Sequence, residues 1–396
     1  MSILILNRNA PYPFHSWLEP LEEELLVLTT SKRAPNVQAA FVEGYEDYEV
    51  NGCIELKAAQ LHEKHHYHTI VATSEYDIYR AAKIRDFVGI KGQSSESALA
   101  FRNKVVMKNI LEKTNIAVPT YREIDSAIDL YEFVQNNGFP IIVKPIDGSG
   151  SEGVTKIDHD DQLYEFVRKT NLTNLEVEAF IEGDMYHIDG LFINGEVAFS
   201  WPSKYMNGCL SHQAGTFNGS YLLDAENLLT MKLNAFVKQV LHALPTPEHI
   251  AYHAEVFVTP DEQLVFCEIA CRRGGGYIAE TIQQAFDIDL TKVSVQAQCG
   301  IDVSLPRALH APLVHSGFLL VPAKKGLLLE LPSECNEEWV TQYEIYARAG
   351  DRYGGAGSSL DNIATFLVKG KDEQEVKQRI ESLAEWFDQQ TKWLEK

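Results

Sequence analysis

The sequence lacks long apolar runs, paired cysteines and an excess of positive charge. No stretch approaches the roughly 18 apolar residues that a membrane-spanning helix needs, so no membrane partner is expected. The six cysteines are scattered and include no Cys-x-x-Cys pair, which favours reduced thiols and a cytoplasmic protein. The apolar run at residues 3–6 is short for a signal peptide and predicts a strand instead.

The charge balance excludes one large class of partner. Lysine and arginine number 35 against 56 aspartates and glutamates, a formal net charge of −21. Such a surface repels a phosphate backbone, so nucleic acid is not an expected partner, although a local basic pocket can still bind a nucleotide. The 45% hydrophobic content indicates a globular protein. A chain of 396 residues is too long for one ordinary hydrophobic core, which favours several domains.

The first hundred residues alternate predicted strands and helices. Apolar runs predict strands at residues 3–6, 24–29 and 68–73, and residues 76–86 have helical periodicity. This alternation is typical of a small α/β domain with a parallel sheet, and the polar run at 92–97 indicates its boundary.

The rest of the chain mixes helices with antiparallel strands. A single helix is predicted over residues 98–114, and Ser126 begins the capping box of another. A strand at 364–368 is followed by an amphipathic helix from residue 372 to the end of the chain.

The strongest chemical signal is a pair of carboxylates in a predicted hairpin over residues 253–268. If the turn centres on Asp261 and Glu262, then Glu255 and Glu268 stand directly opposite each other on one face. Like charges side by side destabilise a sheet unless a cation neutralises them, and Mg²⁺ prefers such oxygen ligands. The alternative is a pair of solvated glutamates on an exposed sheet face.

The residues around this pair favour a cation site over a pair of solvated glutamates. The same register pairs Phe257 with Phe266 beside the site and places Ala270 and Arg272 on the carboxylate face. Residues 268–276 run from the second glutamate into two arginines and three glycines. Glycines let backbone approach a ligand closely, and arginines bind carboxylate or phosphate.

Two lysines and a strand end complete the pattern. Lys144 ends a buried strand before a Gly/Ser-rich loop, an arrangement that suits phosphate, although no Walker loop is present. For this loop, a plain hairpin turn is the alternative. Lys104 is expected to start a helix, and a solvated surface lysine is the alternative for it. The strand end at Glu178 can bind an adenine edge through its backbone while Phe180 and Ile181 pack against the ring.

Together, in this order and spacing, these elements resemble the ATP-grasp superfamily over nearly the whole chain, in the branch shared by biotin carboxylase and amino-acid ligases. The resemblance implies an α/β (α+β) fold with a parallel pre-ATP-grasp domain (1–98) before a two-lobed ATP-grasp fold with antiparallel sheets. That fold comprises a catalytic domain (99–305, lid lobe about 115–178) and a C-terminal cap (306–396). A homodimer through the first domain is common in this branch.

The resemblance also implies roles for single residues. Lys104 and Lys144 match the lysines that hold the α- and β-phosphates, and Arg272 matches the arginine beside the reacting centre. Glu255 and Glu268 match the metal-bridging carboxylates. The further nucleotide-binding positions are Gly148, Ser149, Gly150, Ser151 and Gly153 in the loop, Glu178, Ala179, Phe180 and Ile181 in the hinge, and His187 near the ribose.

Three further positions concern the substrate and the metal. Arg273 is a candidate for binding a substrate carboxylate by bidentate pairing, and Lys204 is a second candidate. The family places asparagine two residues after the second glutamate, where this chain has Ala270, so the usual third metal ligand is missing from its place.

The implied cofactors are ATP and Mg²⁺, with Mn²⁺ as a substitute, and the implied partners are a small-molecule carboxylate and an amine. The implied reaction activates a small carboxylic acid, an amino acid, as an acyl phosphate that the amine then attacks. Two alternatives stay open. One is a carboxylate–thiol ligase that loads an amino acid on a carrier protein, and the other is a non-catalytic ATP-binding regulatory protein, which Ala270 favours.

Overall fold

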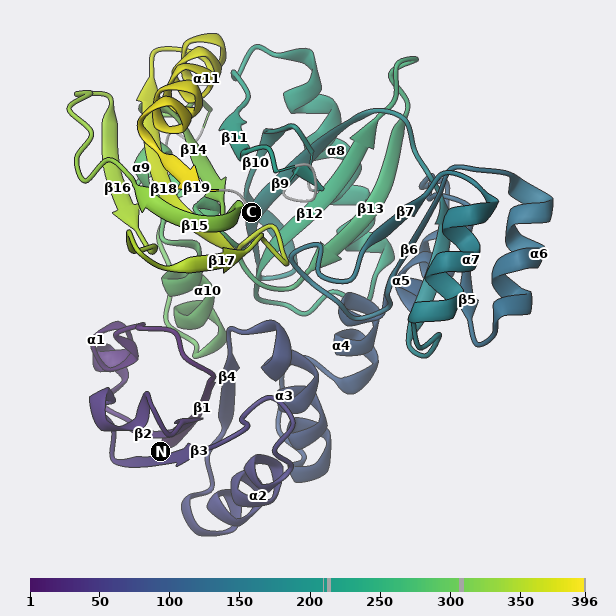
Figure 1. Ribbon diagram of the computed structural model, residues 1–396. Helices are drawn as coiled ribbons and strands as arrows, with labels where there is room; N and C mark the ends of the chain where they lie inside the picture. Colours follow the sequence, from purple (N-terminus) through teal and green to yellow (C-terminus); the bar gives the residue numbers. More distant parts are fainter. Residues whose placement is uncertain (209, 212–214, 306–309, 395–396) are drawn as a thin grey trace.

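The computed structural model describes residues 1–208, 210–211, 215–305 and 310–394. In this part of the chain a parallel four-stranded sheet precedes three sheets built from antiparallel pairs, which confirms the predicted fold class (Figure 1). None of the described helices combines the length and the apolar character needed to cross a membrane.

The N-terminal domain, at the bottom of Figure 1, is built on the parallel sheet in the order β3-β2-β1-β4. Its apolar strands have buried clusters on both faces, as parallel strands require. The strand β3 was not predicted. The elements are β1 (Ser2–Asn7), α1 (Phe14–Leu18), β2 (Glu24–Thr30), β3 (Phe41–Tyr45), α2 (Cys53–His65), β4 (Thr69–Ala72) and α3 (Glu75–Val88).

The single helix predicted over residues 98–114 is two helices, α4 (Ser95–Arg102) and α5 (Lys104–Leu111). Asn103 separates them, because its backbone is extended and its side chain accepts hydrogen bonds from two N–H groups in the first turn of α5. Asparagine favours this capping position over a helix interior. The break makes Lys104 the first residue of α5.

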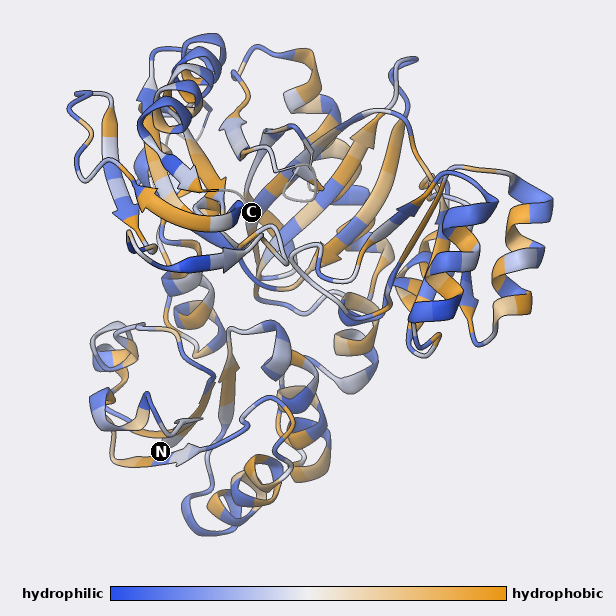
Figure 2. Ribbon diagram, viewed as in Figure 1, coloured by the Kyte–Doolittle hydropathy of each residue, from blue (hydrophilic) through white to orange (hydrophobic). Residues whose placement is uncertain are grey.

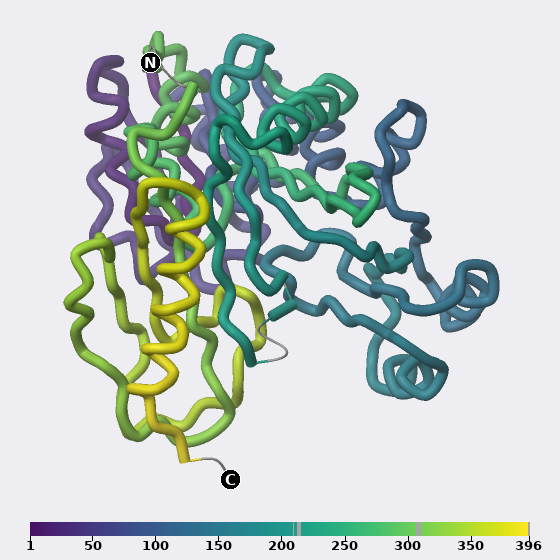
Figure 3. Tube along the Cα trace, turned by 90° about the horizontal axis from the view of Figure 1, so that it is seen from above, coloured from purple at the N-terminus to yellow at the C-terminus, as the bar shows by residue number. Residues whose placement is uncertain are grey.

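The lid lobe is a four-stranded sheet, β5-β8-β6-β7, that carries two helices and projects from the rest of the molecule in Figure 3. The Ser126 hydroxyl accepts the backbone N–H of Asp129, as the predicted cap requires. A separate apolar cluster holds the lobe together. The elements are β5 (Tyr121–Ile124), α6 (Ala127–Asn137), β6 (Ile141–Pro145), β7 (Thr155–Ile157), α7 (Asp160–Lys169) and β8 (Leu175–Ala179).

The central sheet has the order β13-β12-β9-β10-β11-β14-β18-β16, so strands from the C-terminal part complete the sheet of the middle part. Figure 2 shows its strands β12 and β13 as largely hydrophobic. The strands are β9 (Asp184–Ile193), β10 (Glu196–Met206), β11 (Asn218–Leu222), β12 (Ile250–Val258), β13 (Leu264–Ala270), β14 (His315–Pro322), β16 (Val340–Ile345) and β18 (Asn362–Gly370).

The last elements cover this sheet. The final helix, α11, ends at Gln390 and a short strand follows it, so the prediction of a helix to the end of the chain was wrong for residues 392–394; residues 395–396 lie outside the described part. The remaining elements are α8 (Leu228–Ala243), α9 (Ile278–Phe286), α10 (Leu290–Gln298), α11 (Glu373–Gln390), and the small sheet of β15 (Lys325–Glu330), β17 (Arg352–Gly354) and β19 (Lys392–Leu394).

The β12–β13 hairpin changes register beside the carboxylates. Glu255 and Glu268 are directly paired, as predicted, but Val256 pairs with Phe266, so Cys267 is the extra residue of a bulge. The predicted pairing of Phe257 with Phe266 was therefore wrong.

Candidate active site

A cavity of about 750 Å³ lies where the N-terminal domain, the lid lobe and the central sheet meet. This volume is in the range of small-molecule sites. The cavity is lined by most of the predicted site residues: Lys104, Lys144, Gly148, Ser149, Gly150, Ser151, Glu178, Phe180, Ile181, Glu255, Glu268, Arg272 and Arg273.

The two carboxylates share one wall of this cavity. Glu255 and Glu268 stand opposite each other on β12 and β13, and their side chains are 14% and 28% exposed, so they do not lie on an open sheet face. Burial opposes ionisation, but Lys104 and Lys144 outweigh it and lower the pKa of Glu268 to about 2. Two adjacent carboxylates, one of them strongly acidic, fit a divalent cation.

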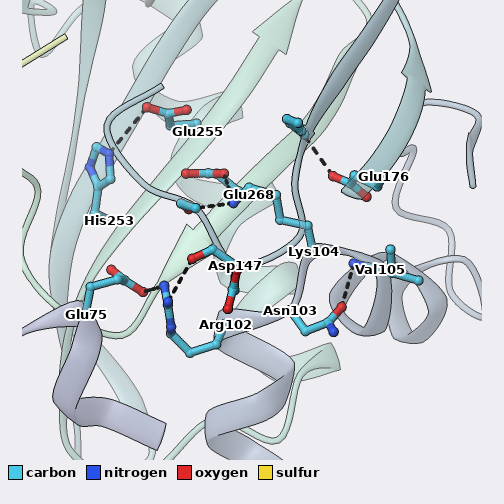
Figure 4. Close-up of polar contacts among 12 residues, drawn as sticks. Glu75, Arg102, Asn103, Lys104, Val105, Asp147, Glu176, His253, Glu255 and Glu268 are labelled. Carbon is cyan, nitrogen blue, oxygen red and sulfur yellow. Dashed lines mark hydrogen bonds and ion pairs between the residues drawn. The ribbon is translucent and has the colours of Figure 1, made fainter. Parts of the chain in front are cut away.

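Lys104 reaches this pair from the start of α5 (Figure 4). Its Nζ lies 3.1 Å from Glu268 Oε2 and donates a hydrogen bond of 2.8 Å to the carbonyl of Gly148 in the glycine-rich loop. Lys104 therefore joins the carboxylate wall to the loop predicted to cover the phosphates.

Lys144 belongs to a buried cluster of four charges that the sequence only partly indicated. Glu178 accepts hydrogen bonds of 2.7 Å from Lys144 and from Lys108, and Lys108 also pairs with Glu176 at 2.7 Å. Burial opposes ionisation of Glu178, yet Lys144 and Lys108 outweigh this effect and lower the pKa of Glu178 to about 2. The position of Lys108, one helical turn after Lys104, was the signal that could have revealed it.

The glycine-rich loop has left-handed backbone at three positions, with φ of 64° at Gly150, 58° at Ser151 and 72° at Gly153. The C-terminal part holds it in place, because the N–H and hydroxyl of Ser359 both donate to the Gly150 carbonyl, at 3.1 and 3.0 Å. The sequence carried no recognisable sign of this contact.

Several predicted residues lie outside the cavity lining. His187 is buried, and its ring nitrogens bond to Asp189 and Ser220 at 2.6 Å each, so the structure does not place it as a direct ribose ligand. Lys204 pairs with Asp184 at 2.6 Å and also falls outside the lining.

One loop position and one hinge position also lie outside the cavity lining. These are Gly153 and Ala179. The backbone N–H groups of Ala179 and Phe180 donate to carbonyls of Thr120 and Pro140, so both are used inside the lid lobe.

A histidine that the prediction missed lies beside the carboxylates. His253 is two residues before Glu255 on β12 and lines the cavity; its Nδ1 is 2.9 Å from Asp189 and its Nε2 is 3.5 Å from Glu255. Burial would lower the pKa of His253, but Asp189 and Glu255 outweigh this and raise it to about 10. The two-residue spacing from Glu255 was the available signal.

Two consecutive arginines form the wall toward the N-terminal domain. Arg272 pairs with Glu75 at the start of α3; burial would lower the pKa of Arg272, but this carboxylate raises it. Arg273 donates to the hydroxyl of Tyr12 at 2.8 Å and lies 3.6 Å from Glu280. Both guanidinium groups are therefore positively charged, and the residues that hold them lie outside the β12–β13 hairpin.

Comparison with known proteins identifies this arrangement. Residues 101–276 match the model of the ATP-grasp domain family. The chain therefore contains a domain of the ATP-grasp superfamily, as predicted from the sequence. It is an enzyme of the ATP-grasp ligase family, as predicted from the sequence.

Relatives of this ATP-grasp protein include amino-acid ligases. It is 27% identical to an L-arginine-specific L-amino acid ligase of Bacillus subtilis, over 95% of this chain and 94% of the relative. The crystal structure of an L-amino acid ligase from Bacillus licheniformis has the same fold, with a TM-score of 0.78 at 18% identity over 100% of this chain and 98% of that one.

An ATP complex shares the fold as well. The structure of carboxyaminoimidazole ribonucleotide synthase from Aspergillus clavatus complexed with ATP has a TM-score of 0.72 at 14% identity, over 98% of this chain and 99% of that one.

Proposed function

We propose that this enzyme is an ATP-dependent carboxylate–amine ligase that activates a small carboxylic acid, an amino acid, as an acyl phosphate and couples it to an amine. The observation that carries the proposal is the convergence of Glu255, Glu268, Lys104, Lys144 and Arg272 on one cavity. A relative named as an L-amino acid ligase, aligned over nearly the whole chain, supports the choice of substrate class.

In this proposal, the lysines, the carboxylates and the arginine of the site have separate roles. Lys104 and Lys144 hold the phosphates of ATP beneath the glycine-rich loop, which excludes water from the acyl phosphate. A divalent cation held by Glu255 and Glu268 would neutralise charge on the transferring phosphoryl group. Arg272, fixed by Glu75, adds positive charge on the side of the N-terminal domain.

The substrates occupy the part of the cavity next to the N-terminal domain. Residues 7–10, at the end of β1, and residues 73–76, which follow β4, line the same cavity as Arg273. We assign to Arg273 the binding of the carboxylate of an amino-acid substrate. Tyr12 orients its guanidinium, which can pair with a carboxylate through two hydrogen bonds. Lys204, paired with Asp184 outside the lining, has no role in this proposal.

A screen for phosphate release tests the proposal. The purified enzyme is incubated with ATP, Mg²⁺ and all pairs of the common amino acids, and the products of active pairs are identified by mass spectrometry. Release that depends on an amino acid, with a dipeptide as the product, supports the ligase. Release that requires a carrier-protein thiol supports a thiol ligase instead, and absence of release with every acid supports a non-catalytic ATP-binding protein.

A further inference from the structure

The position opposite Ala270 holds a histidine. Ala270 pairs directly with His253 across β12 and β13, and His253 pairs in turn with Asp189 on β9. The neighbouring row of the same sheet face contains Glu255 and Glu268. An imidazole therefore adjoins the carboxylate pair at the place where β13 offers only a methyl group.

The imidazole is oriented toward the carboxylates. Asp189 Oδ1 lies 2.9 Å from His253 Nδ1, and Asp189 Oδ2 lies 2.6 Å from His187, so the aspartate is held from two sides. Gly274 packs over this contact, since a Cβ there would lie 2.9 Å from both Asp189 Oδ1 and His253 Nδ1. These contacts fix Nδ1 away from the cavity and leave Nε2 facing Glu255.

The separation of the two facing atoms fits a shared cation. His253 Nε2 lies 3.5 Å from Glu255 Oε1, and Figure 4 shows the ring directed at this carboxylate. Two ligands at about 2.1 Å from one metal ion and roughly 90–110° apart are about 3.0–3.5 Å from each other. A histidine whose other ring nitrogen bonds to a carboxylate is the usual arrangement around a bound metal.

We propose that His253 Nε2 is the third protein ligand of the divalent cation held by Glu255 and Glu268, in place of a side chain at position 270. Asp189 is then a positioning residue, which accepts the Nδ1 proton of His253. Binding of the cation releases the Nε2 proton, so the ring that binds the metal is the neutral imidazole. This inference rests on the metal role of the carboxylates in the proposed function. It adds a nitrogen to an otherwise oxygen site, which favours Mn²⁺ relative to Mg²⁺.

A separate metal site inside the histidine cluster is disfavoured. The candidate ligand atoms of His187, Asp189 and His253 all lie within 4.8 Å of one another. Asp189 already uses one oxygen for each histidine, at 2.6 and 2.9 Å, so these atoms form a hydrogen-bonded support rather than an open set of ligands.

Pulsed electron paramagnetic resonance of bound Mn²⁺ tests the proposal directly. The protein is labelled with ¹⁵N in its histidines and loaded with Mn²⁺ and ADP, so that ¹⁵N hyperfine coupling reports a histidine ligand and excludes adenine nitrogen. We expect coupling in the wild type and in His242→Gln, a matched change at an exposed histidine of α8, and none in His253→Gln.

Metal affinity gives a second readout. We expect His253→Gln to weaken Mn²⁺ binding at least tenfold, with a smaller loss for Mg²⁺, and His253→Gln/Ala270→Asn to recover part of the loss. Bound Mn²⁺ without histidine coupling in the wild type would overturn this proposal while leaving the metal site of the proposed function intact. Absence of Mn²⁺ binding would overturn both.

Discussion

Lys104 Nζ lies 3.1 Å from Glu268 Oε2, so a residue predicted to bind phosphate forms an ion pair with a residue predicted to bind the metal. Lys104 is the first residue of α5, and Glu268 is near the end of β13. A phosphate beside Lys104 and a cation beside Glu268 would also attract each other, which links binding of the two ligands.

Removing the charge of Glu268 tests the metal wall. We expect Glu268→Gln to lower the rate of ADP release by about 10²–10³-fold, because a neutral amide holds the cation poorly. The circular dichroism spectrum should not change. Glu262→Gln, on the exposed turn of the same hairpin, is the matched control and should keep wild-type activity. A wild-type rate in Glu268→Gln would contradict the role assigned here.

Arg273 should act on the substrate rather than on the nucleotide. Hydrogen bonds to charged groups contribute about 1.5–3 kcal/mol, so Arg273→Lys should raise the KM for the amino acid by roughly 10–150-fold. The KM for ATP should stay near its wild-type value. Arg122→Lys, on the lid strand β5 and 39% exposed, is the control. Equal changes in both KM values would count against a carboxylate contact.

Lys108 should be needed for stability, because it is fully buried between Glu176 and Glu178. Lys108→Met leaves the buried Glu176 with only Lys144, at 3.7 Å, and should lower the free energy of unfolding by about 3–5 kcal/mol. Urea denaturation measures the loss. Lys113→Met, an exposed change just after the same helix, should have little effect. Lys108→Met/Glu176→Gln should regain stability, since it removes one of the carboxylates, and a single variant as stable as the control would refute the argument.

Acid should weaken the fold through the same cluster. The pKa of Glu178 is lowered to about 2, whereas glutamate in an unfolded chain titrates near pH 4.3. The unfolded state therefore binds more protons as the pH falls below about 5, and the stability present above that pH is progressively lost toward pH 2. Denaturation at several pH values should show this slope, and Glu178→Gln should make it shallower. Parallel slopes would show that Glu178 does not contribute.

Much of the fold was visible in the sequence. The parallel strands of the first domain were predicted because both of their faces are buried and they are apolar throughout. The strand β3 was missed, because its five residues include Glu43 and Gly44 and only Tyr45 among them is buried. The break at Asn103 was missed in the helix predicted over residues 98–114, since helical periodicity continues on both sides of it, although the expectation that Lys104 starts a helix was correct.

The site was predicted less completely. Opposition of Glu255 and Glu268 was predicted correctly although the assumed register does not hold toward the turn, because the bulge at Cys267 shifts the pairing by one residue. The prediction missed Lys108, Asp189 and His253, whose roles depend on neighbours distant in the chain.

The sequence by itself determined the local chemistry: which strands are buried, where the carboxylates, lysines and arginines stand, and that they follow the order of an ATP-grasp enzyme. Only the tertiary structure decided which of them meet. The sheet order places β9 beside β12, so Asp189 lies against His253, and chain folding places Ser359 against Gly150. Such contacts join residues 64 and 209 positions apart, and local hydrophobic patterning carries no information about them.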